Sequence, residues 1–128
     1  MENLFYVPET VRLQGNQESF TPLLQGQGEL LVERIVSYGH TTPEGEWYAQ
    51  ERDEWVTVLE GEAKLGYEDG REVTLGRGDH VFLPKYVRHR VAYTSSPCIW
   101  LAVHGANLTQ ARDVLSGTTG NSTCATKP

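Results

Sequence analysis

Short runs of Val, Ile, Leu, Tyr and Trp follow one another from Leu30 onward, and most of them end at Gly, Pro or Asp. Closely spaced apolar runs with turn residues between them are typical of an all-β sandwich or barrel. We therefore expect one barrel domain over residues 30–105, built as an antiparallel meander. The pattern predicts strands over residues 30–38, 46–50, 54–60, 62–68, 71–75, 79–83, 87–94 and 98–104.

Turn residues between the predicted strands support antiparallel neighbours. Asp69-Gly70 separates a run that ends at Tyr67 from one that begins at Val73. This dipeptide favours a two-residue hairpin, because both central positions of such a turn need a positive φ. Further tight turns are expected at Gly61 and over residues 76–79, so the strands connect directly rather than through crossover helices.

Both ends of the chain lack the strand pattern. Residues 1–29 carry Gly and Pro among scattered apolar positions, and we expect an arm with little regular structure that packs on the barrel. Residues 106–128 are expected to begin with a short helical turn over 107–116, capped by Asn107. Gly, Thr, Ser and Asn dominate from residue 117 onward, so a disordered tail is predicted there.

Charge and composition exclude several classes of partner. The 128 residues include 11 Lys and Arg against 17 Asp and Glu, a formal net charge of −6, which gives no support for binding nucleic acid. No stretch approaches the roughly 20 apolar residues of a membrane helix, and the N-terminus lacks a signal-peptide pattern. We expect a soluble, cytoplasmic protein that binds a small molecule. Cys98 lies in an apolar run and Cys124 in a polar one, so Cys98 is predicted to be a buried small hydrophobe rather than half of a disulfide.

The stretch from Trp47 to Glu62 resembles the first conserved motif of cupins. Glu54 and Gly61 match the Glu and Gly of that motif at the right spacing. Tyr48 and Gln50 stand where the family has two His. The motif's carboxylate is therefore present, and its two imidazoles are replaced.

A second stretch, from Gly78 to Tyr93, resembles the second cupin motif. Gly78, Pro84 and His89 match, while Tyr86 replaces the second Gly of the motif and Tyr93 its Asn. The resemblance implies a small single-domain bacterial cupin with an antiparallel jelly-roll barrel, also called a double-stranded β-helix. It further implies a site inside the barrel and a homodimer.

Strand phase places the same residues inside the barrel. Tyr48 and Gln50 share one face of their segment because side chains alternate across a strand. Glu54 precedes Val56 in the same phase, which puts a carboxylate at the end of an apolar inward face. Such a group is costly unless it is paired, protonated or bound to a cation. His89 is expected to project from the same buried side of its own strand.

Two interpretations of this site stay open. In the first, Gln50, Glu54 and His89 hold a divalent transition metal (Mn, Fe, Ni or Zn). Tyr48 and Glu54 are then the catalytic residues of an isomerase, lyase or dioxygenase that acts on a small oxygenated metabolite. In the second, the same side chains form a metal-free polar network that binds or senses a small molecule. The fold alone does not choose between them.

Three further residues are candidates for the pocket or its rim. Tyr86 follows Pro84 on a loop and is expected at the rim. Trp100 offers an aromatic wall for a bound ligand. His104 lies in phase with Trp100, so it is placed to point into the barrel near His89 and to shuttle protons. A histidine at the end of a strand more commonly caps the strand or lies on the surface.

Overall fold

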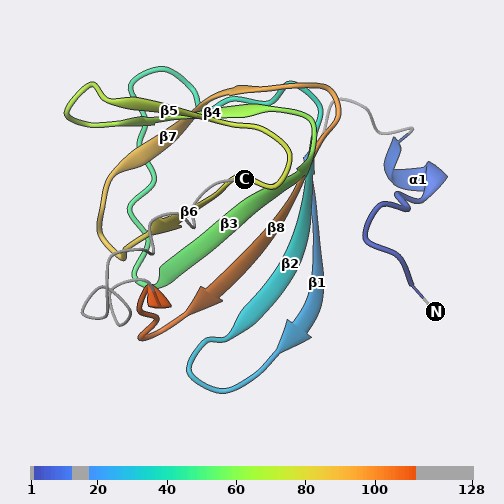
Figure 1. The fold of residues 1–128 in the computed structure, drawn as a ribbon, viewed down its shortest axis with the longest axis horizontal. Helices are drawn as coiled ribbons and strands as arrows, with labels where there is room; N and C mark the ends of the chain where they lie inside the picture. Colours follow the sequence, from blue (N-terminus) through green and yellow to red (C-terminus); the bar gives the residue numbers. More distant parts are fainter. Residues whose placement is uncertain (1, 13–17, 112–128) are drawn as a thin grey trace, which may run out of the picture.

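The protein is an antiparallel all-β barrel in the computed structural model, which describes residues 2–12 and 18–111 (Figure 1). Its strands form a five-stranded sheet in the order β1-β2-β8-β3-β6 and a three-stranded sheet in the order β5-β4-β7. This arrangement confirms the predicted jelly-roll class. The elements are α1 (Glu9–Arg12), β1 (Ser19–Gln25), β2 (Leu31–Ser37), β3 (Asp53–Glu60), β4 (Ala63–Tyr67), β5 (Glu72–Leu75), β6 (His80–Leu83), β7 (His89–Thr94) and β8 (Cys98–Gly105).

Seven of the predicted strands correspond to β2 through β8, each within two residues at its ends. The strand predicted over residues 46–50 is wrong. In the described structure this segment makes one isolated bridge, in which Tyr48 and His89 exchange backbone hydrogen bonds of 2.8 and 3.0 Å. The segment therefore touches β7 at one point without extending its sheet.

The expectation of little regular structure before residue 30 is also wrong, because β1 pairs along β2. Pro22 and Gly26 argued against a strand there. A proline is tolerated in an edge strand, which is paired on one side only, and the register shifts between Pro22 and Leu24.

The residues before β1 lie against the outer side of β2. Arg34 is buried, and its Nη1 donates to the carbonyl oxygens of Tyr6 at 2.7 Å and Leu4 at 3.4 Å. Of the predicted helical turn at 107–116, residues 107–110 are not helical, and residues 112–116 lie outside the described residues, as do the predicted disordered tail and Cys124. Within the described part of the chain, no helix has the length and apolarity needed to cross a membrane.

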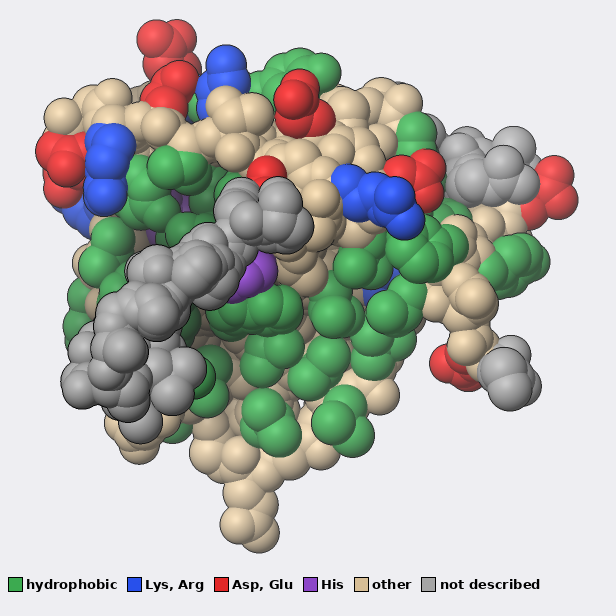
Figure 2. All heavy atoms as spheres, in the orientation of Figure 1, with side chains coloured by type: hydrophobic (Ala, Val, Ile, Leu, Met, Phe, Trp, Pro, Cys, Tyr) green, Lys and Arg blue, Asp and Glu red, His purple; other side chains and the backbone are tan. Residues whose placement is uncertain are grey.

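Charged side chains gather at one end of the visible surface. Figure 2 shows most of them over the end that carries β4 and β5, while hydrophobic side chains dominate over the five-stranded sheet. Two ion pairs lie at the charged end, Arg88 with Glu68 at 3.1 Å and Arg71 with Asp69 at 3.8 Å. Exposed pairs of this kind contribute at most about 1 kcal/mol each, so the fold depends mainly on its interior.

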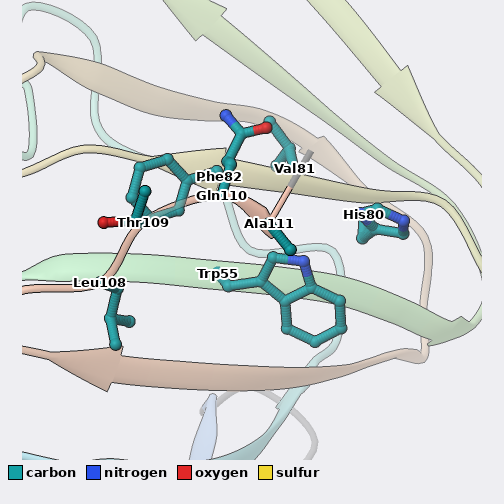
Figure 3. Close-up of a pocket in the computed structure, with 8 residues that line it drawn as sticks. All are labelled: Trp55, His80, Val81, Phe82, Leu108, Thr109, Gln110 and Ala111. Atoms are coloured by element: carbon teal, nitrogen blue, oxygen red, sulfur yellow. The ribbon is translucent and has the colours of Figure 1, made fainter. Parts of the chain in front are cut away.

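A groove of about 480 Å³ lies on the outer face of the five-stranded sheet (Figure 3). Trp55 of β3 and Phe82 of β6 line it, and the ring of His80 lies 5.3 Å from that of Trp55. Residues 108–111 cross one side, fixed where the Leu108 amide donates to Asp53 Oδ2 at 2.9 Å. None of the predicted site residues lines this groove, because the outward positions of β3 alternate with those that carry Glu54.

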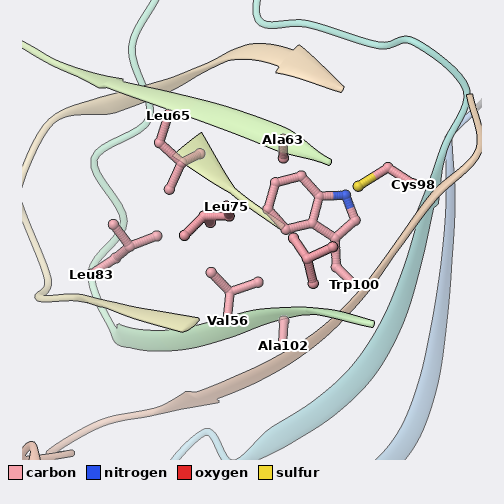
Figure 4. Close-up of a cluster of buried hydrophobic side chains, with 9 residues drawn as sticks. Val56, Ala63, Leu65, Leu75, Leu83, Cys98, Trp100 and Ala102 are labelled. Carbon is pink, nitrogen blue, oxygen red and sulfur yellow. The ribbon is translucent and has the colours of Figure 1, made fainter. Parts of the chain in front are cut away.

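The core lies between the two sheets and surrounds the indole of Trp100 (Figure 4). Cys98, Trp100 and Ala102 point inward from alternate positions of β8. Cys98 has no exposed surface and is a free thiol, and burial raises its pKa to about 12, so the predicted small hydrophobe is confirmed. The buried apolar cluster consists of Val56, Val58, Ala63, Leu65, Leu75, Leu83, Cys98, Trp100 and Ala102.

Gly61 connects β3 to β4 where the chain approaches the turn before β8. Its φ is +93°, in the left-handed region that favours glycine. A Cβ atom at this position would collide with Ser95 Oγ and lie 2.7 Å from the carbonyl oxygen of Pro97. Both the positive φ and the lack of room for a Cβ atom therefore require a glycine at position 61. This requirement explains the match to the first cupin motif.

Gly61→Ala is expected to lower the free energy of unfolding by about 2 to 4 kcal/mol, because it adds a clash to an unfavourable φ. Gly70→Ala is the matched control, since Gly70 has a φ of +92° with nothing within 4 Å of a built Cβ. We expect the control to lose about 1 to 2 kcal/mol from conformation alone. Urea unfolding of both variants measures the difference, and equal losses would contradict the crowding at Gly61.

Candidate functional site

A cavity of about 160 Å³ lies inside the barrel between the two sheets. It contains every predicted site residue except Tyr86. The structure thus brings together side chains from seven strands and from the segments that precede β1 and β3. The lining consists of Glu18, Phe20, Glu33, Ile35, Tyr48, Gln50, Glu54, Val56, Leu65, Leu83, His89, Val91, Trp100 and His104.

Glu54 is the buried acid of the cavity. It points inward from the second position of β3, in phase with Val56, and only 8% of its surface is exposed. Gln50 Nε2 donates to Glu54 Oε1 over a long 3.3 Å. Burial raises the pKa of Glu54 above its usual 4.5, and His104 and His89 offset part of that effect by favouring the charged carboxylate.

His89 faces the same cavity from the start of β7. The ring is buried, and its Nδ1 lies 3.2 Å from the carbonyl oxygen of Val87. A carbonyl oxygen can only accept, so Nδ1 carries the hydrogen of this bond and Nε2 of the neutral ring is left as an acceptor. Tyr48 stands beside it with a ring separation of 5.9 Å and is 47% exposed, which places its phenol at the mouth of the cavity.

His104 is buried in the cavity, with 3% of its surface exposed, so the surface or capping alternative is wrong. It lies directly across from Glu54 in the pairing of β3 with β8. Its Nε2 lies 2.9 Å from Glu33 Oε2, and its Nδ1 has no hydrogen-bond partner among the described residues. The buried pair of His104 and Glu33 therefore lies at the same end of the cavity as the buried carboxyl of Glu54.

Sequence reasoning missed two carboxylates of the lining, Glu33 and Glu18. Glu33 had a detectable signal, because it is in phase with Ile35, whose side chain also lines the cavity. Glu18 had none, since it precedes a strand that was not predicted. Its Oε2 accepts a 2.6 Å hydrogen bond from Ser37 Oγ, which draws it toward β2.

Tyr86 contributes through its backbone. Its amide donates to the carbonyl oxygen of Gln50 at 2.8 Å, while its side chain is 64% exposed and is not among the described residues that line the cavity. Its φ is +68°, which is uncommon for a residue with a Cβ atom. The requirement for this conformation explains why the second cupin motif has glycine here.

The cupin resemblance implies a metal ion, which requires a suitable set of donor side chains in the cavity. Among the described residues, no group of three His, Cys, Asp or Glu side chains is placed to hold a metal ion. Of the predicted ligands, only Glu54 and His89 are strong donors, and the amide nitrogen of Gln50 is turned toward Glu54. This set does not fit a tightly held transition metal, which normally takes at least three protein ligands.

Comparison with known proteins places the chain in one family. A family model described as a cupin domain matches residues 34–104. A solved structure from Ralstonia eutropha JMP134, a "putative mannose-6-phosphate isomerase", is 40% identical with a TM-score of 0.75, and the match covers 84% of this chain and 98% of that one. No curated protein matches the chain.

Two more distant structures show the fold alone. A cupin superfamily protein from Desulfitobacterium hafniense DCB-2 is 16% identical with a TM-score of 0.62, over 72% of this chain and 80% of that one. An RmlC-like cupin protein from Desulfovibrio desulfuricans is 15% identical with a TM-score of 0.62, over 82% of this chain and 93% of that one. With its two motifs, its two-sheet barrel and a family model that matches residues 34–104, the chain belongs to the cupin family.

Proposed function

We propose that the protein is an enzyme that moves a proton on a small oxygenated metabolite bound inside the barrel, in isomerase-type chemistry. The observation that carries this proposal is the carboxyl of Glu54, which is buried, faces the cavity and accepts one long hydrogen bond. Burial raises its pKa above the usual 4.5, which makes the carboxylate a stronger base than an exposed one. Acids in cavities whose pKa is shifted by burial are candidates for catalysis on this ground.

In the proposed reaction, the Glu54 carboxylate takes a proton from a carbon next to a carbonyl group and returns it to the neighbouring carbon. The carbonyl oxygen gains a proton from the phenol of Tyr48 as the first carbon loses one. When the former carbonyl carbon takes up its proton from Glu54, the hydroxyl group on the first carbon returns a proton to the Tyr48 phenolate and becomes the new carbonyl. The acceptor nitrogen of His89 orients a substrate hydroxyl. Gln50 holds the carboxyl in place.

The Ralstonia relative supports an isomerisation as the class of reaction, because its name is that of an isomerase and it is 40% identical to this chain. The name belongs to that protein. A protein that only binds its ligand is the alternative, and the exchange experiment below separates the two.

Glu54→Gln is expected to slow proton exchange between substrate and solvent by about 10² to 10⁴-fold, since it removes the general base without changing its shape. The assay incubates a panel of unphosphorylated aldoses and ketoses in D₂O and follows deuterium incorporation by mass spectrometry. Glu60→Gln is the matched control, because it makes the same change on the exposed end of β3. Binding of a panel compound without exchange in the wild type would contradict the catalytic proposal.

The raised pKa of Glu54 predicts how stability depends on pH. The folded protein binds this proton more tightly than the unfolded chain, so its free energy of unfolding falls as pH rises from the unfolded pKa through the folded one. Glu54→Gln cannot titrate. The stability of the variant relative to the wild type should therefore increase as pH rises above the usual pKa of 4.5, by about 1.4 kcal/mol per unit of pKa difference. Urea unfolding across this range checks it, and a pH-independent difference would refute the raised pKa.

The weak donor set predicts little bound metal. Protein purified without a nickel column is expected to carry less than about a tenth of an equivalent of Mn, Fe, Ni or Zn, since two strong donors do not retain these ions. Elemental analysis by plasma mass spectrometry measures the content. Nearly one equivalent of metal, lost in Glu54→Gln and kept in Glu60→Gln, would instead support Gln50, Glu54 and His89 as ligands.

A further inference from the structure

The cavity has an unusual balance of charge. Three carboxylic acids line it, Glu18, Glu33 and Glu54, and no Lys or Arg is among the described lining residues. The chain as a whole has 11 Lys and Arg, and none of those in the described ranges is a lining residue. An acid-rich cavity without a fixed cation attracts positive or neutral groups and repels anions.

The basic residues nearest in sequence to the site are turned away from it or lie outside its wall. Arg34 follows the lining residue Glu33, but alternation along β2 sends its side chain to the outer face, where it bonds the carbonyl oxygens of Tyr6 and Leu4. Arg52 precedes β3 and is not among the described lining residues, although its charge lies near enough to favour the carboxylate form of Glu54. The Arg34 guanidinium is therefore not placed to clamp an anion, and Arg52 acts on the cavity from outside its lining.

The remaining polar groups add acceptors more than donors. His104 Nε2 is already used by Glu33, and Trp100 Nε1 donates to Ser37 Oγ at 3.1 Å. In its neutral form His89 presents its Nε2 as an acceptor, because its Nδ1 donates to a carbonyl oxygen. Each carboxyl group has more lone pairs than the single hydrogen bond it accepts. The wall therefore suits a ligand that donates several hydrogen bonds.

We infer that the ligand of this cavity is a small neutral or cationic molecule, rich in hydroxyl or amino groups, that carries no phosphate or carboxylate. This inference rests on the proposed function and narrows its substrate class. A single unscreened pair of like charges about 4 Å apart weakens binding by on the order of a thousandfold at an effective dielectric constant near 20. A sugar phosphate, the substrate class in the name of the Ralstonia relative, is thus disfavoured here.

The size of the cavity sets a second limit on the ligand. Its 160 Å³ is well below the roughly 300 to 1,000 Å³ of pockets for drug-sized ligands. The ligand is therefore about the size of a small polyol or amino alcohol, or the reacting end of a sugar whose remainder passes the mouth at Tyr48.

The test measures thermal unfolding of the full chain in the presence of a bacterial small-molecule extract. The extract is divided on an anion exchanger into an unbound fraction, neutral and cationic, and a bound fraction, anionic. We expect only the unbound fraction to raise the melting temperature, by several degrees at a ligand concentration about 100 times Kd. The shift should persist in Glu60→Gln and disappear in Glu54→Gln. Mannose and mannose 6-phosphate are the defined probes, and the phosphate should bind at least about a hundredfold more weakly.

Two outcomes contradict the inference, and they are distinguishable. A shift produced by the bound fraction or by mannose 6-phosphate, and lost in Glu54→Gln, would overturn the charge preference while leaving the proposed function in place. No shift with either fraction would overturn the proposed function itself, because the cavity would then take no small molecule. Mass spectrometry of compounds retained after gel filtration identifies the bound species in the first case.

Discussion

A carboxyl group held almost out of solvent inside an apolar barrel is the constraint on which the site depends. Glu54 lies two residues before the core residue Val56, on the same inward face of β3. It therefore cannot leave the interior unless the whole strand is turned over. An isolated buried carboxylate is costly, and it has either to take up a proton or to find partners. Gln50 donates a hydrogen bond to Glu54, and His89 and His104 favour its charged form. These three residues come from other segments of the chain, which the barrel brings together.

The two-sheet architecture also divides the interior into two regions. Cys98 and the aliphatic residues around it fill one region, and Trp100 and Val56 lie on its border, because they belong to the apolar core and also line the cavity. The polar residues occupy the other, next to the mouth where Tyr48 is half exposed. An acid at the border of an apolar region experiences desolvation from one side and remains accessible to a ligand from the other. This position explains why burial, rather than a neighbouring charge, dominates the pKa of Glu54.

The parts of the fold that depend on local pattern could be predicted from the sequence. Alternation identified β2 through β8, and motif spacing identified Glu54 and His89, which are 35 positions apart and show no local relation. β1 was missed because Pro22 is unfavourable in a central strand, and the sequence does not show that this strand lies at an edge. Residues 46–50 were predicted as a strand because apolar and polar residues alternate there, but pairing depends on a partner that runs alongside.

The pairing of Glu33 with His104 could not be predicted either, because it joins residues 71 positions apart through the adjacency of β2 and β8. Each residue alone has an ordinary explanation as a surface or capping group. Together they place a buried pair beside Glu54 and help to set the charge of the cavity. The chemistry of the site is thus a property of the sheet order, while the identity of its central acid is a property of the sequence.

Titration of the Glu54 side-chain carboxyl by carbon-13 NMR measures directly whether burial raises the pKa of this group. The Glu54→Gln spectrum assigns the resonance by its disappearance. We expect a midpoint above the usual value of 4.5, because burial dominates the environment of this group. A midpoint at or below 4.5 would show that Glu54 is solvated or fully paired as a carboxylate, and would contradict its role as a proton-transfer group.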